Sequence, residues 1–263
     1  MKIISFSAIK GGVGKTTLAY NYGEWLASQG NKVLMIDLDH QCNLTQIYSL
    51  FETEGTVANI FKQSGTVTVH SVKENIDLIA GYIRLDSIEK ELETKSYKDM
   101  LLYMWFADNY DSKNLEQYDY VLIDCHPDFS TATRNAIICS HDVFSPVIPS
   151  EHGYLAKFNI QERLEELKKE AFDFATRESY VTAKLYFIGN MIKHNTKSSK
   201  ELVQSLTGED NVLAMIPQKE LFNRSTLDKT SLAQMKEDKV LYQKNKKFFD
   251  EIDMTFSAIT DKI

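Results

Sequence analysis

A glycine-rich run near the start of the chain carries residues that could bind a polyphosphate. Lys10-Gly11-Gly12-Val13-Gly14-Lys15-Thr16-Thr17 follows the apolar residues 3–6. Glycines have no side chain, so successive backbone N–H groups can approach phosphate oxygens closely. Lys15 would then reach the β- and γ-phosphates, and the Thr16 hydroxyl would bind magnesium. The run therefore predicts a phosphate-binding loop.

Two later apolar runs end on acidic residues that could serve a metal ion or a water molecule. Residues 33–36 lead into Asp37 and Asp39, and residues 120–123 lead into Asp124. The carboxyl ends of parallel strands form the ligand-binding edge of an open α/β sheet. Asp124 would hold the metal through its water shell, while one of Asp37 and Asp39 supports the metal and the other orients the attacking water. Asp39 could instead cap the next helix, because Asp is a common N-cap residue.

The elements that must position these residues are expected as alternating strands and helices. Residues 3–29 read as strand, loop and helix, the setting that a phosphate-binding loop requires. Further strands are expected at residues 33–36, 76–79, 120–124, 143–148, 185–188 and 212–216. Their alternation with helical stretches predicts an α/β fold with three layers, α/β/α, around a mostly parallel sheet of about seven or eight strands.

The domain organisation is expected to be simple. The sequence has 4 prolines and no Pro/Gly-rich linker, which predicts a single domain over residues 1–263. A helix at about 234–261 is expected to dock on the core. A second helix is expected over residues 154–175, with an inner face of apolar residues at helical spacing. That face comprises Leu155, Phe158, Leu164, Leu167 and Phe174.

Composition narrows the class of protein. The chain has 263 residues, of which 43% are hydrophobic and 25% are charged, which is typical of a globular protein. No apolar stretch reaches the roughly 20 residues of a membrane span, and no secretion signal is expected ahead of the first strand. Cys42, Cys125 and Cys139 are odd in number and lack C-x-x-C spacing, which favours free thiols in a reducing cytoplasm.

The formal charge of −7 argues against a protein that coats nucleic acid with its whole surface. Residues 184–247 nevertheless hold twelve Lys and Arg against seven Asp and Glu, an excess of five positive charges. This asymmetry is compatible with a local DNA-binding face or with an ordinary solvated lysine surface. The candidate DNA contacts are Lys193, Lys197, Lys200, Lys219, Arg224 and Lys229.

The first loop departs from the common phosphate-loop pattern in a way that resembles the ParA/MinD family of ATPases. Ile9 stands where the common pattern has glycine, and Lys10 follows it, as in the deviant motif K-G-G-x-G-K-[ST]. Four later segments resemble parts of ParA-type partition ATPases. Residues 34–45 resemble the first switch and residues 118–127 the second, residues 147–151 resemble the strand that follows, and residues 215–217 resemble the nucleotide-base loop. Because the loop begins at Lys10, we expect no N-terminal helix-turn-helix domain, so the chain resembles the short, plasmid-type branch.

The resemblance implies roles within an ATP-sandwich homodimer. Lys10 would cross the interface to contact the ATP phosphates of the partner, while Lys15 and Thr16 would bind phosphate and Mg²⁺ in their own subunit. Asp39 would position the hydrolytic water, and Asp124 would support magnesium. Such a site makes hydrolysis depend on dimerisation, because the second subunit supplies part of the charge stabilisation.

The resemblance also implies a function. Asn190 and Pro217 would line the adenine. The ATP-bound dimer would bind DNA nonspecifically, in the cytoplasm on the nucleoid. Weak ATP hydrolysis, stimulated by a ParB-type or small ribbon-helix-helix centromere-binding adaptor, would release it. The function predicted is therefore DNA partition.

Other activities of the same fold are weighed against this one. A MinD-like membrane-positioning ATPase would need a basic amphipathic C-terminal helix; apolar residues such as Phe248 and Phe256 do fall at helical spacing, but Asp253 and Asp261 lie among them. A nucleotide-gated DNA-binding scaffold with negligible turnover would keep the same loop, whereas the presence of Asp39 favours hydrolysis. An iron–sulfur reductase would need interface cysteines, which Cys125 does not match.

The switch segments carry unusual residues. Family members commonly have proline where His40 and His126 stand and glycine at Cys42, and a small residue at Asp128. The two histidines could carry protons or, more simply, be loop residues. His40, Cys42, Cys125 and His126 would form a zinc ligand set if the switches met, but the same loops are already committed to nucleotide.

Overall fold

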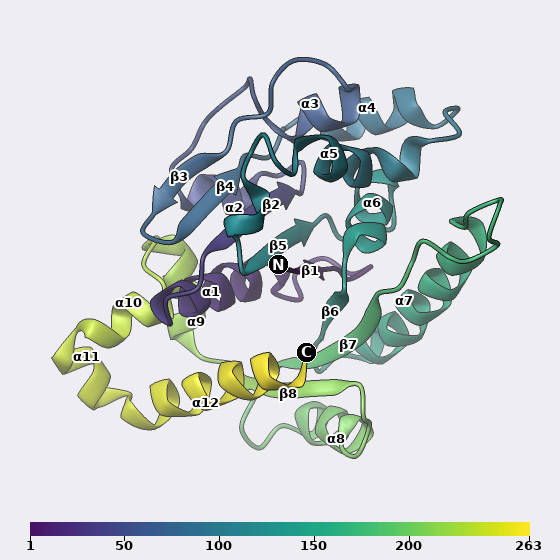
Figure 1. Ribbon diagram of the computed structural model, residues 1–263. Coiled ribbons are helices and arrows are strands. Elements are labelled where there is room, and N and C mark those ends of the chain that lie inside the picture. The colour runs from purple at the N-terminus through teal and green to yellow at the C-terminus, as the bar shows by residue number, and fades with distance from the viewer.

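The protein folds around one eight-stranded sheet (Figure 1). The structure is a computed structural model that describes residues 1–263, apart from the side chains of residues 151–154. The strands are β1 Lys2–Phe6, β2 Val33–Leu38, β3 His70–Lys73, β4 Ile76–Ile79, β5 Tyr120–Cys125, β6 Asp142–Val147, β7 Lys184–Ile192 and β8 Val212–Pro217. Their order in the sheet is β3-β4-β2-β5-β1-β6-β7-β8, and each pairing is parallel except that of β3 with β4.

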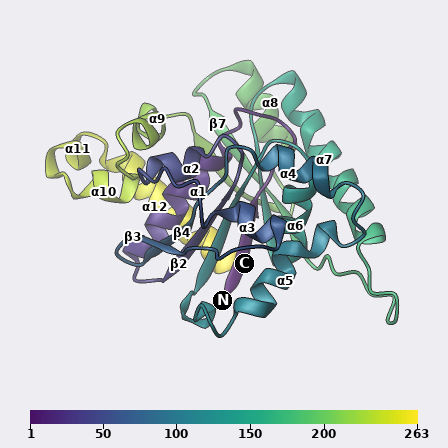
Figure 2. The same cartoon turned by 90° about the horizontal axis from the view of Figure 1, so that it is seen from above.

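Helices cover both faces of the sheet (Figures 1 and 2). They are α1 Lys15–Ser28, α2 Asn43–Ile47, α3 Val57–Lys62, α4 Leu85–Leu92, α5 Leu101–Asn109, α6 Thr131–Cys139, α7 Glu151–Glu170, α8 Lys197–Leu206, α9 Glu220–Leu227, α10 Leu232–Glu237, α11 Lys239–Lys244 and α12 Lys246–Lys262. Alternate residues of β2 enter different cores: Met35 packs with α1 and α12, whereas Leu34 and Ile36 pack with α3 to α6. The predicted three-layer α/β/α fold is therefore confirmed.

The topology explains why the site residues converge. Strands β1, β2 and β5 lie side by side in the centre of the sheet, and Asp37 and Asp124 are register partners. Each of these strands is buried along its length, apart from the partly exposed residues at the starts of β1 and β5. The phosphate-binding loop and both acidic strand ends therefore emerge at one edge of the sheet.

Helix α7 differs from the expectation for residues 154–175. It ends at Glu170, and its buried seam runs through Ile160, Leu164 and Leu167, spaced by three or four residues. Leu155 and Phe158 are about half exposed, and Phe174 lies beyond the helix with 88% of its surface exposed. The predicted inner face is thus wrong for these three residues. The part of the prediction that concerns residue 154 lies outside the described side chains.

The expected C-terminal helix at about 234–261 is divided into α10, α11 and α12. The first break falls at Asp238, whose carboxylate accepts hydrogen bonds from the N–H groups of Val240 and Leu241 at 2.8 and 3.1 Å. An Asp side chain that caps a new helix competes with continuation of the previous one. The second break falls at Asn245, the N-cap residue of α12.

Helix α12 packs against the sheet and α1. The ring of Phe256 lies 5.4 Å from that of Tyr22 and 5.8 Å from that of Trp25, and 2% of its surface is exposed. Replacing Phe256 with alanine is expected to lower the free energy of unfolding by about 3–5 kcal/mol, because it leaves a cavity in the core. Urea unfolding measures this loss. Met254→Ala, on the exposed side of the same helix, is the control; equal effects of the two changes would contradict the packing.

Candidate functional site

The glycine-rich loop wraps the N-terminus of α1. Gly12 and Gly14 have φ angles of +71° and +90°, a region that side chains disfavour. Asn190 of β7 donates its amide N–H to the carbonyl of Val13 at 2.8 Å. A Cβ atom on Gly14 would lie only 2.6 Å from that amide nitrogen, so glycine is required here. The loop conformation leaves the α1 N-terminus open to an anion.

A cleft of about 630 Å³ opens over this loop. Lys15, Thr16 and Asp39 all line it, and Lys15 is largely buried. Its other lining residues are Gly11, Gly12, Gly14, Thr17, Gln41, Asn43, Gln46, Ile47, Phe51, Pro127, Thr226, Leu227 and Lys229. The cleft joins a cationic helix end to a carboxylate, which suits a polyphosphate with a divalent cation.

Asp124 is buried without a well-formed hydrogen bond to either of its oxygens in the part of the chain that the structure describes. Burial and then the neighbouring Asp37 raise its pKa well above the ordinary value, whereas the Thr16 hydroxyl and Lys15 act to lower it. A buried carboxylate with free lone pairs is stabilised by a cation. Asp124 and the nearby Thr16 hydroxyl therefore fit a magnesium ion.

Asp37 is engaged differently. Its Oδ2 accepts hydrogen bonds from the backbone N–H and the hydroxyl of Thr45 at 2.9 and 2.7 Å, and its Oδ1 accepts one from the N–H of Asp39 at 3.1 Å. Burial raises the pKa of Asp37 to about 6. These bonds fix the turn that follows β2. They favour a structural role for Asp37 over the predicted role of metal ligand.

Asp39 lies at the rim of the cleft and is largely buried. Its Oδ1 accepts a hydrogen bond from the N–H of Gln41 at 2.9 Å, so one oxygen stabilises a local turn. The N-cap position of α2 belongs to Cys42. The alternative in which Asp39 caps this helix is therefore wrong.

Lys10, the first lysine of the loop, contacts a residue that is far away in the sequence. Lys10 Nζ donates a hydrogen bond to the Ser150 hydroxyl at 3.0 Å, at the start of α7. Lys10 and Lys15 thus have different surroundings although they belong to the same short loop.

A second hollow adjoins the cleft at Gly14 and Thr17, which line both. Asn190 and Pro217, from the ends of β7 and β8, meet in it. Its other lining residues are Leu18, Met191, Gln218, Lys219, Phe222 and Asn223. The structure thus brings the two predicted adenine-lining residues together beside the loop, in a hollow lined by both apolar and polar side chains.

The six basic residues predicted to contact DNA form separate groups. Lys193, Lys197 and Lys200 are exposed at the start of α8. The other three lie on or beside α9, which is well separated from α8 in both views (Figures 1 and 2). Of these, Arg224 forms an ion pair of 2.9 Å with Asp228, while Lys229 Nζ donates to the Ser49 hydroxyl at 2.8 Å in the nucleotide cleft. The structure therefore places Lys229 at the cleft, apart from the lysines at the start of α8.

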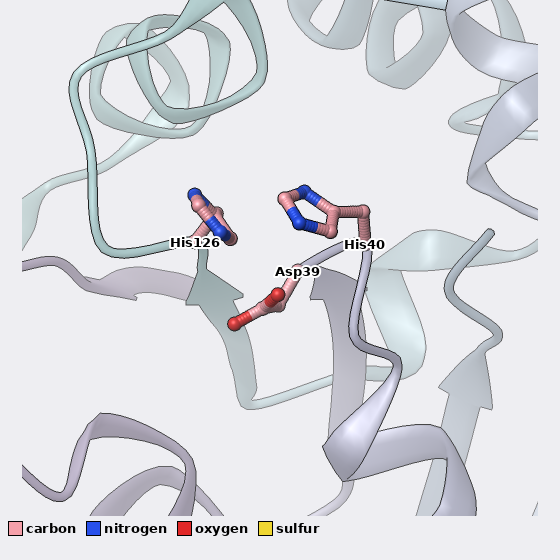
Figure 3. A group of neighbouring side chains, drawn as sticks. All are labelled: Asp39, His40 and His126. Carbon is pink, nitrogen blue, oxygen red and sulfur yellow. The ribbon is translucent and has the colours of Figure 1, made fainter. Parts of the chain in front are cut away.

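The two switch segments meet through their histidines. The rings of His40 and His126 stack with centroids 4.0 Å apart, and the Asp39 carboxylate lies beside them (Figure 3). The thiols of the disfavoured zinc set lie elsewhere: Cys125 is fully buried, and the Cys42 Sγ faces the carbonyl of His40 at 3.7 Å. Cys42 and Cys125 therefore lie outside the group that the two histidines form with Asp39.

Comparison with known proteins places this loop and sheet in a family. The family model described as an AAA domain (AAA_31) matches residues 1–175, about two thirds of the chain. The chain belongs to this family. Together with the deviant loop, the relatives identify a ParA/MinD-type P-loop ATPase that resembles plasmid partition proteins, as the sequence predicts.

Relatives cover the chain to different extents. The chromosome-partitioning ATPase Soj of Treponema pallidum is 28% identical over 216 residues, 78% of each chain. A protein of Borrelia burgdorferi B31 described as a plasmid partition protein, solved with AMPPNP bound, superposes with a TM-score of 0.76 at 25% identity, covering 100% of this chain and 99% of that one. An uncharacterized protein of Mycobacterium tuberculosis is 33% identical over 156 residues, and the match spans 46% of its length, about half.

Proposed function

We propose that this protein is a partition ATPase that hydrolyses ATP with magnesium and binds DNA as an ATP-joined dimer. The observation that carries the proposal is the cleft in which Lys15, Thr16 and Asp39 meet beside the buried Asp124. The partition ATPase among its relatives and the AMPPNP-bound plasmid partition protein support the same conclusion. We further propose that residues 1–263 act as a single ATPase domain.

Within one subunit, the loop amides from Gly11 to Thr17 bind the phosphates, and Lys15 neutralises the β- and γ-phosphates. Thr16 and Asp124 hold magnesium. Asp39 orients the attacking water, while Asn190 and Pro217 border the adenine. Asp37 supports this arrangement by fixing the turn that carries Asp39.

Lys10 acts on the ATP of a second subunit. In the single chain its ammonium donates a hydrogen bond to the Ser150 hydroxyl. In the dimer, Lys10 gives up this hydrogen bond and contacts the ATP phosphates of the facing protomer. A charged group supplied across an interface makes the complete site depend on dimerisation, and hydrolysis removes the γ-phosphate that joins the subunits.

The dimer binds DNA nonspecifically in the cytoplasm, on the nucleoid, and a ParB-type or ribbon-helix-helix adaptor stimulates hydrolysis. Pairing two copies doubles the number of phosphate contacts, which steeply increases affinity through counterion release. The MinD-like alternative is disfavoured because Phe248, Ile252, Phe256 and Ile259 of α12 are buried. Among the residues described, no helix combines the length and apolar character of a membrane span.

DNA retention with ATP, ADP and a slowly hydrolysed ATP analogue tests this function. We expect retention with ATP and the analogue but not with ADP. The exposed lysines of α8 are the better DNA candidates, so Lys197→Glu with Lys200→Glu should weaken binding at least about tenfold. Because each dimer loses four phosphate contacts, the slope of log affinity against log salt should fall by about 4. Lys90→Glu with Lys95→Glu gives the same charge change on and beside α4 as a control.

Two outcomes would contradict these assignments. Equal DNA retention with all three nucleotides would remove the support for a nucleotide-gated DNA binder. If the α8 variant retains DNA normally and reversing the charges of Lys219 and Arg224 abolishes DNA retention instead, the DNA-binding surface lies at α9. Phosphate release measured in the same samples distinguishes an ATPase, which releases phosphate, from a DNA-binding scaffold without turnover, which does not.

A further inference from the structure

We propose that Asp39, His40 and His126 form a binding site for a divalent transition-metal ion of the zinc class, separate from the magnesium site. One side-chain ligand atom from each lies within 4.8 Å of the others. The residues come from the ends of β2 and β5, which are adjacent in the sheet. The site therefore joins the segments that follow β2 and β5 (Figure 3).

Metal binding would draw the three ligand atoms closer together. Ligands about 2.0–2.1 Å from a tetrahedral Zn²⁺ lie roughly 3.3 Å from one another. The three ligand atoms lie within 4.8 Å of one another and the two imidazole rings are stacked, so the rings must turn for both in-plane lone pairs to point at one ion. Asp39 has one oxygen engaged by Gln41, and its second oxygen can serve as the ligand.

A fourth residue orients one of the histidines. Nδ1 of His126 lies 2.9 Å from Oδ2 of Asp128. A carboxylate beside Nδ1 favours Nε2 as the ligand atom, an arrangement found in many metal-bound histidines. Asp128 is itself fixed, since its Oδ1 accepts a hydrogen bond from the N–H of Ser130 at 3.1 Å.

The donor set selects the class of metal. Two imidazoles and one carboxylate suit Zn²⁺, Co²⁺ or Ni²⁺, whereas Mg²⁺ prefers oxygen ligands alone. Thr16 and Asp124 supply such oxygens. Three protein ligands leave coordination positions for water or for a phosphate oxygen.

Metal at this site would suppress hydrolysis. This consequence rests on the proposed function, because Asp39 is the residue assigned to the attacking water. A metal ion that coordinates the Asp39 carboxylate prevents this carboxylate from orienting the water. The same ion also links the two switch segments. The site would thus make ATP turnover sensitive to transition-metal availability.

Titration calorimetry of chelator-treated protein with Zn²⁺, and the visible absorption of Co²⁺, test binding without reference to ATP. We expect one ion per chain. His40→Ala and His126→Ala should each weaken binding by about 100-fold or more, and Asp128→Asn by about 10–100-fold. His194→Ala, which removes an exposed histidine at another place, should bind like the wild type. Circular dichroism establishes that each variant is folded.

The outcomes separate this site from the ATPase. Absence of stoichiometric binding, or unchanged affinity in the double variant H40A/H126A, overturns the site. If the double variant Cys42→Ser with Cys125→Ser loses Zn²⁺ binding and the histidine variants keep it, the proposed site is also overturned, and the thiols are the ligands. With binding established, Zn²⁺ should inhibit Mg²⁺-dependent hydrolysis in the wild type and not in H40A/H126A. Binding by a protein that shows no hydrolysis would leave the site intact and contradict the proposed function instead.

Discussion

Lys10→Ala is expected to lower the rate of ATP hydrolysis by roughly 10²–10³-fold, the usual effect of removing one preorganised charge-stabilising donor. The same change should abolish the ATP-dependent dimer, because the proposed role of Lys10 is to contact phosphate across the interface. ATP binding to the monomer should persist, since Lys15, Thr16 and the loop amides are intact. Phosphate release, light scattering and a fluorescent ATP analogue measure the three quantities.

Ser150→Ala provides the matched control for Lys10. It removes the hydroxyl that the Lys10 ammonium contacts at 3.0 Å in the single chain and leaves the lysine in place. We expect dimerisation and hydrolysis to be retained. Loss of both in Ser150→Ala would indicate that the contact within one chain, rather than a contact with the partner, is what Lys10 provides.

Asp39→Ala is expected to separate dimerisation from turnover. Loss of the water-positioning carboxylate should lower hydrolysis by about 100-fold or more, while ATP and Lys10 still join the subunits. The variant should therefore accumulate as an ATP-bound dimer that keeps its DNA. Nucleotide content after gel filtration and DNA retention over time measure this state.

Asp37→Asn is the comparison for Asp39→Ala. Asp37 is hydrogen bonded to Thr45 and to the N–H of Asp39, so its replacement should loosen the turn and reduce both dimerisation and turnover. A long-lived ATP dimer in Asp37→Asn, with normal hydrolysis in Asp39→Ala, would exchange the roles assigned to the two residues.

Much of the fold and of the loop site follows from local sequence. The buried strands are short apolar runs of residues such as Val33–Leu38, bounded by turn residues, and glycines at positions 12 and 14 are required by positive φ angles. β3 escaped prediction because His70–Lys73 is a partly exposed edge strand without an apolar run. Edge strands carry little burial pattern from which to infer them.

The remaining differences depend on contacts between distant segments. Helical spacing alone could not reveal that α7 buries the seam through Ile160, Leu164 and Leu167, since that depends on where the sheet and α8 lie. The pairing of β2 with β5 likewise decides that His40 meets His126. The place of Lys229 in the nucleotide cleft depends on how α9 returns to the loop between α2 and α3, which holds Ser49.

The central claim is that Lys10 of one subunit completes the ATP site of the other. The most direct measurement mixes Lys10→Ala protein with Asp39→Ala protein and follows phosphate release. In a mixed dimer, the Lys10→Ala subunit keeps its own Asp39 and receives Lys10 from its partner, so one complete site forms. We predict hydrolysis well above that of either variant alone. A mixture no more active than its components, although mixed dimers form, would contradict the claim, because a lysine that serves its own subunit cannot be supplied by another.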